Sequence, residues 1–158
     1  MNRRVFVSSV SAVSAIALSQ RALAHHGWSS FDEARPIYLV GKVKLLKWQN
    51  PHVELVITMA ADAALPVNLA KRAFPAQTAP VDGAKILAAA ALPKKRGDWT
   101  LELSPMTRID AWKVTEPKVD DIMEAVGYTF KNESGAAIAR VEYLIVGDKI
   151  FGLRSMPA

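Results

Sequence analysis

The chain contains no cysteine and only three histidines among its 158 residues. The absence of cysteine excludes disulfides and thiolate metal ligands, so the fold must be stabilised by its apolar core. Any metal ion must then be bound through nitrogen or oxygen atoms. His25, His26 and His52 are therefore the strongest nitrogen ligands among the side chains.

Several motifs of common enzymes are also missing. The sequence has no glycine-rich phosphate loop, and no Ser-His-Asp or Cys-His set that could form a nucleophile system. We therefore do not expect a conventional hydrolase or a nucleotide-dependent enzyme.

The N-terminus has the three parts of a cleavable signal peptide over residues 1–24. Residues 1–4 are cationic, residues 5–18 are mildly apolar, and Ala-Leu-Ala at 22–24 is an A-x-A cleavage site. Residues 2–7 resemble a twin-arginine export signal, with ordinary secretion as the alternative. We expect a periplasmic or secreted protein that begins at His25, with no transmembrane segment after cleavage, because no later stretch approaches ~20 apolar residues.

The charge of the mature chain is small. The full sequence has 20 Lys and Arg against 15 Asp and Glu, a formal charge of +5. Removal of Arg3, Arg4 and Arg21 leaves 17 basic side chains against 15 acidic ones, or about +2. This balance gives no electrostatic support for a nucleic-acid partner.

The pattern of residues 25–158 predicts a single mainly β domain. Strand-like segments occupy residues 37–48, 52–59, 98–104, 122–131, 138–146 and 149–153. A short helix is expected over 106–112, with Ser104 as its cap. Three strands, a helix and further strands are typical of a small Greek-key barrel of the OB-like type.

Residues 60–97 interrupt this pattern with four prolines, many alanines and the basic cluster Lys94-Lys95-Arg96. We expect this insertion to run along the barrel rim. A short helix near residues 84–92 is compatible with the alanine content, and a mobile loop is the alternative.

Large aromatic residues are spread over the whole mature chain, at Trp28, Phe31, Trp48, Trp99 and Trp112. They could form a face on which a ligand stacks. Core packing is the better interpretation, because a small barrel needs large side chains to fill it.

Four short stretches carry a family resemblance. They are HHGWSSFD at 25–32, LVGKV at 39–43, WQNPH at 48–52 and residues 99–105. Together they resemble DUF6152, a family of exported bacterial proteins of unknown function. The resemblance implies a small β-barrel, departs from the family in residues 60–97, and brings no established reaction.

The histidines predict a metal site. Cleavage before His25 would leave an α-amine beside an imidazole, and His52 could complete a T-shaped nitrogen site resembling the histidine brace of copper proteins. His26 is an alternative ligand. Copper is favoured because Cu²⁺ leads the divalent affinity order and prefers tetragonal nitrogen ligation. The α-amine, with a pKa near ~7.7, must lose its proton first, so binding should weaken as pH falls.

The competing interpretation is that the histidines are structural, in a docking leader and in hairpin packing. Two functions therefore stay open: a periplasmic copper-binding or metal-handling module, and a non-catalytic barrel that binds a periplasmic protein or a small ligand through its aromatic surface. A copper oxidase or oxygenase would use the same site but would also need an open coordination position and a substrate face.

Overall fold

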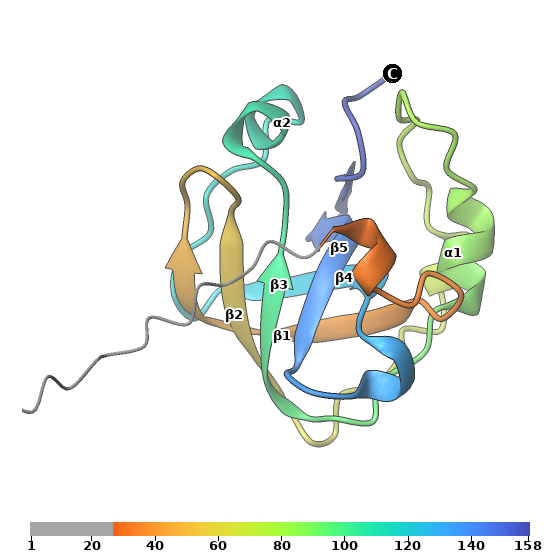
Figure 1. Ribbon diagram of the computed structural model, residues 1–158, viewed down its shortest axis with the longest axis vertical. Helices are drawn as coiled ribbons and strands as arrows, with labels where there is room; N and C mark the ends of the chain where they lie inside the picture. Colours follow the sequence, from red (N-terminus) through yellow and green to blue (C-terminus); the bar gives the residue numbers. More distant parts are fainter. Residues whose placement is uncertain (1–26) are drawn as a thin grey trace, which may run out of the picture.

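The computed structural model describes residues 27–158, and Figure 1 shows how their strands and helices are arranged. The predicted signal peptide, His25 and His26 lie outside the described residues. The elements are β1 (Ile37–Lys47), β2 (Glu54–Met59), α1 (Gly83–Ala89), β3 (Gly97–Glu102), α2 (Met106–Ala111), β4 (Ile122–Tyr128), β5 (Ile138–Val146) and β6 (Lys149–Gly152). Within this part of the chain, no helix is long and apolar enough to cross a membrane.

The strands form a closed barrel because β3 pairs with both β2 and β5. The sheet order is β3-β2-β1-β4-β5-β6, and the β3–β5 pairing that closes it is parallel. The other pairings are antiparallel, and α2 lies between β3 and β4 in the chain. This arrangement of five barrel strands and one helix confirms the predicted OB-like barrel.

Strand β1 is long because it pairs with two neighbouring strands. Its first half pairs with β4 and its second half with β2. An irregularity between Val43 and Leu45 shifts the register, so Leu45 points outward and is 61% exposed. Gly41 permits a close crossing nearby, since a Cβ atom there would lie 2.5 Å from the carbonyl oxygen of Thr58.

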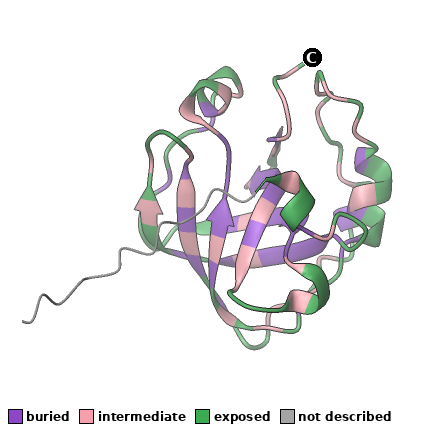
Figure 2. Ribbon diagram, viewed as in Figure 1, coloured by how far each residue is buried: buried purple, intermediate pink, exposed green. Residues whose placement is uncertain are grey.

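The barrel interior holds the larger of two apolar clusters, and Figure 2 shows buried residues along the strands. The second cluster lies outside the barrel, where Leu69 and Leu87 join Tyr38 of β1 and Tyr143 of β5. Apolar residues of the insertion pack against the side of the barrel, because the outward-pointing Tyr38 and Tyr143 need apolar neighbours.

The start of α2 differs from the prediction. Ser104 does not cap the helix, because its hydroxyl donates to the carbonyl oxygen of Leu153 at 2.7 Å. The backbone N–H of Met106 donates instead to Oδ1 of Asn50 at 3.2 Å. The first turn of α2 is therefore tied to the β1–β2 turn, the segment that carries His52.

Candidate functional site

His52 lies in the β1–β2 turn, two residues before β2, and is partly buried. The backbone N–H of Val53 donates to the carbonyl oxygen of Ser104 at 3.1 Å, and the N–H of Leu103 donates to the carbonyl oxygen of Val53 at 2.9 Å. Val53 is fully buried and belongs to the barrel core. Because side chains alternate along a strand, Glu54 lies on the opposite, outward side.

We call the outward side of β2, β3, β5 and the second half of β1 the outer face. The strand register aligns two rows of side chains across it. The charged row consists of Lys47, Glu54, Glu102 and Arg140. The mainly apolar row consists of Leu45, Val56, Thr100 and Ile138. A groove of about 430 Å³ runs over this face.

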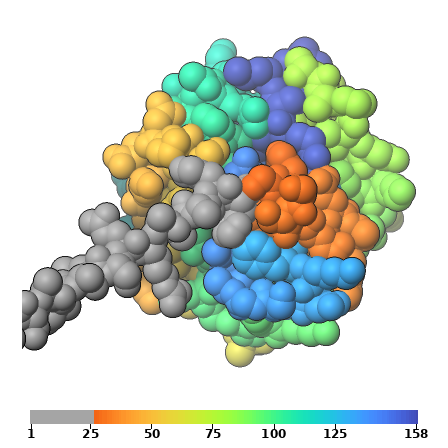
Figure 3. All heavy atoms as spheres, viewed as in Figure 1, coloured from red at the N-terminus to blue at the C-terminus, as the bar shows by residue number. Residues whose placement is uncertain are grey.

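Trp28 is held at the β5 side of the outer face. The guanidinium carbon of Arg154 lies 3.9 Å from the centroid of the Trp28 ring, and that of Arg140 lies 5.3 Å away. The ring also meets Tyr128 edge-on, with the centroids 6.2 Å apart. We refer to Trp28, Arg140 and Arg154 as the Trp28 anchor. Figure 3 shows the segment that begins at Gly27, in orange, against later parts of the chain in blue.

Arg154 is itself fixed by two carboxylates. It donates to Glu142 and to Glu33, each at 2.7 Å, and Glu142 is completely buried. Burial alone would lower the pKa of Arg154, but its hydrogen bonds to Glu142 and Glu33 outweigh burial and raise the pKa. Arg154 therefore stays charged and immobile beneath the Trp28 ring. The sequence signal for this buried pair is Glu142 itself, a carboxylate within the mainly apolar β5, because a buried charge in such a strand needs a partner.

The Trp28 anchor lies across β3 from β2. Arg140 of the anchor is in register with Glu102 of β3, which is in register with Glu54 of β2. Neighbouring strands are about 4.8 Å apart, so β5 and β2 are separated by roughly 10 Å across β3.

The structure brings only part of the predicted metal site into view. His52 lies in the β1–β2 turn, whereas His25 and His26 lie outside the described residues. Within residues 27–158, no group of three or more His, Cys, Asp or Glu side chains could hold a metal ion.

The five large aromatic residues do not share one face. Trp99 is completely buried in the barrel, as the core interpretation predicts, and Phe31 is 6% exposed and stacks on Phe130. The indole N–H of Trp112 donates to the carbonyl oxygen of Ser155 at 2.9 Å. Trp48 and Trp112 are partly buried against the barrel core, and Trp28 contacts Arg140 of the outer face.

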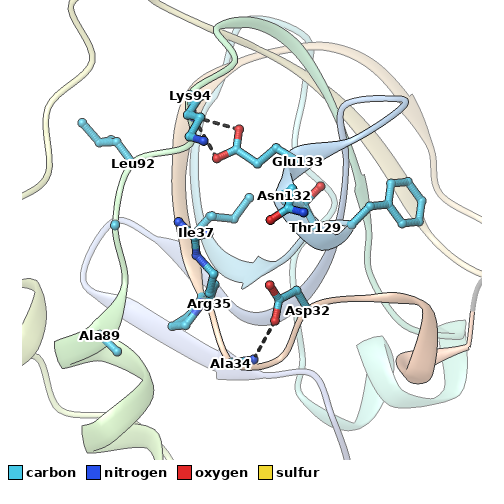
Figure 4. Close-up of a pocket in the computed structure, with 13 residues that line it drawn as sticks. Asp32, Ala34, Arg35, Ile37, Ala89, Leu92, Lys94, Thr129, Asn132 and Glu133 are labelled. Carbon is cyan, nitrogen blue, oxygen red and sulfur yellow. Dashed lines mark hydrogen bonds between the residues drawn. The ribbon is translucent and has the colours of Figure 1, made fainter.

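A small polar cavity of about 150 Å³ lies between the segment after Trp28 and the β4–β5 loop (Figure 4). Its carboxylates already bind backbone: Glu133 accepts from the N–H of Lys94 at 2.8 and 3.0 Å, and Asp32 accepts from the N–H of Ala34. Asn132 and Glu133 have left-handed φ angles of 58° and 55°. The bonds to Glu133 hold this loop in place, and the cavity is smaller than ordinary ligand pockets of roughly 300–1,000 Å³.

The comparisons with known proteins agree with the sequence resemblance. The model of DUF6152, a family of unknown function, matches residues 13–70. This range contains all three histidines, β1 and β2, and ends before α1. Neither the curated proteins nor the solved structures gave a match.

Proposed function

We propose that the mature protein is an exported module that binds one copper ion at its N-terminus, with His25, His26 and His52 as candidate ligands. The observation that supports this proposal best is the position of the Trp28 anchor. It fixes Trp28, two residues after His26, beside Arg140 of the outer face, and the register of β5, β3 and β2 connects Arg140 to Glu54, two residues after His52. This proximity supports the proposal that the N-terminal histidines and His52 bind one metal ion.

The chemistry of the site would come from nitrogen atoms. The α-amine and the Nδ1 atom of His25 can chelate a metal ion together, and the imidazole of His52 can bind from the opposite side. His26 offers its own imidazole as the alternative to one of these ligands. Such a set suits Cu²⁺, which prefers tetragonal nitrogen ligation. The hydrogen bonds of Asn50 and Val53 hold the backbone on both sides of His52 in place.

Export is part of the same proposal. Only removal of residues 1–24 would give His25 a terminal α-amine. The proposed compartment is the periplasm, reached through the twin-arginine or the ordinary secretory route. Edman sequencing of the exported protein should begin at His-His-Gly. A mature chain that starts at another residue would remove the α-amine ligand and contradict the site.

The contribution of His52 can be tested with a matched pair of variants. Loss of a residue that only hydrogen-bonds to a metal ligand already lowers metal affinity about 10–100-fold, so loss of the ligand itself in His52→Gln should cost at least as much. Gln49→Ala, in the same turn, should bind copper like the unchanged protein. Calorimetric titration of Cu²⁺ measures both affinities. Equal affinities in the His52→Gln variant and the unchanged protein would contradict the proposed ligand set.

The alternative function is a non-catalytic barrel that binds a protein or small ligand on its surface. The groove on the outer face favours this function, because its volume of about 430 Å³ lies in the range of ligand sites. A module of this kind would not respond to blocking of the α-amine. Ligand binding that survives both amine acetylation and the His52→Gln substitution would favour the alternative.

A further inference from the structure

A second cavity lies on another side of the molecule, where the insertion meets the barrel. It has a volume of about 400 Å³ and lies between α1 and the turn at residues 33–36, next to Tyr128 and Arg154. This volume is in the range of small-molecule sites. Helix α1 lies beyond the residues that the family model matches, so this chain's own insertion builds one wall.

The wall formed by α1 is held in place by packing and by a cap. Leu87 of α1 is buried in the second apolar cluster against the barrel. Asp82 accepts a hydrogen bond from the backbone N–H of Lys85 at 3.1 Å and so caps the helix. The other wall is tied to the barrel by the ion pair between Glu33 and Arg154. The cavity is therefore bounded by two fixed walls.

The lining combines apolar surface with charges of both signs. Pro36, Val81 and Ile86 supply apolar contacts. Lys85 lines the cavity from α1 and has no ion-pair partner among residues 27–158. Glu33 lines it from the other wall and keeps one carboxylate oxygen outside its bond to Arg154.

We propose that this cavity binds a short apolar peptide through both of its charged ends. The peptide carboxylate would pair with the Lys85 ammonium group, and the peptide α-amine would pair with Glu33 or Asp82. Apolar side chains of the peptide would pack on Pro36, Val81 and Ile86. A ligand with a single charge would form an ion pair with only one of these charged groups. The cavity shares Arg154 with the Trp28 anchor, but its proposed ligand contacts are Lys85, Glu33 and Asp82 and do not include the histidines.

The dipeptide Leu-Leu and its blocked forms test the proposal. NMR titration of the purified protein with Leu-Leu should shift the signals of Val81, Ile86 and Tyr128. N-acetylated Leu-Leu keeps only the carboxylate, and Leu-Leu amide keeps only the amine. An exposed ion pair contributes up to about 1 kcal/mol, so each blocked form should bind roughly threefold to fivefold more weakly. Equal affinity for all forms, or no shift at the cavity, would overturn the proposal.

Two substitutions on α1 separate this site from general effects. Ala89→Trp fills the cavity and should abolish binding, whereas Ala88→Trp adds the same ring at an exposed position that does not line it. Lys85→Gln should lose the preference for a free carboxylate and keep the preference for a free amine. Unchanged binding in Ala89→Trp, with its fold confirmed by circular dichroism, would place the ligand elsewhere and contradict the inference.

Discussion

Replacing Trp28 with alanine tests the anchor on which the outer face depends. The change removes a ring whose centroid lies 3.9 Å from the guanidinium carbon of Arg154 and 5.3 Å from that of Arg140. A cation–π contact contributes about 0.5–1 kcal/mol when exposed and about 2 kcal/mol when desolvated. The side chains of Arg154 and Arg140 are 24% and 11% exposed. We therefore expect the free energy of unfolding to fall by about 2–3 kcal/mol.

The same substitution should weaken copper binding indirectly. Without the ring, the backbone after Gly27 is no longer fixed on the outer face. Ordering one residue costs about 1–2 kcal/mol, so re-ordering one or two residues on metal binding would cost about 2 kcal/mol. This cost corresponds to roughly a 30-fold loss of affinity. Trp28→Phe keeps an aromatic ring and should retain most of the copper affinity.

Urea unfolding and calorimetric Cu²⁺ titration measure the two effects separately. Trp112→Phe is the matched control, because it changes another tryptophan, whose indole N–H donates to the Ser155 carbonyl oxygen, and leaves Trp28 and both arginines in place. Loss of that hydrogen bond should cost about 1 kcal/mol of stability and leave copper affinity unchanged. Copper affinity in Trp28→Ala equal to that of the unchanged protein would refute the role of the anchor in positioning the N-terminus.

Three further predictions concern the barrel and the metal site. Glu142→Ala leaves Arg154 without its buried partner and should lower the free energy of unfolding by about 3–5 kcal/mol, and a loss below about 1 kcal/mol in urea unfolding would contradict the buried pair. Gly41→Ala forces a Cβ atom against the backbone of Thr58 and should lower the free energy of unfolding by about 1–3 kcal/mol, seen as a lower melting temperature. An unchanged melting temperature would contradict the close contact between Gly41 and Thr58. Copper affinity should fall about tenfold per pH unit below ~7.7 as the α-amine of His25 becomes protonated, and competition titrations that show no change between pH 6 and 8 would exclude that ligand.

The barrel could be predicted because its strands carry local signals. Alternating or β-branched segments separated by turn residues predict strands. The predicted bounds of β5 match the observed Ile138–Val146, and the predicted β1 ends one residue later than the observed strand. The single helix between the third and fourth strands then selected the OB-like arrangement. These features depend on residues close together in the sequence.

The features that were missed depend on contacts between distant residues. Glu142 is paired with Arg154, which reaches it from beyond β6, and Trp28 contacts Arg154, Arg140 of β5 and Tyr128 of β4. The outward position of Leu45 follows from the register shift in β1, which the residue pattern alone does not locate. The candidate metal site was predicted from residue types and from the position of the cleavage site. The structure adds the outer face, with the Trp28 anchor at its β5 side.

The most direct test of the proposed function compares two N-termini. Protein that begins at His25 should bind one Cu²⁺ tightly by calorimetry and show nitrogen hyperfine structure in its EPR spectrum. The same protein with one glycine added before His25 has no α-amine on that histidine, so its affinity should fall sharply and its spectrum should change. Equal affinity and identical spectra for the two proteins would contradict a copper site built on the mature N-terminus.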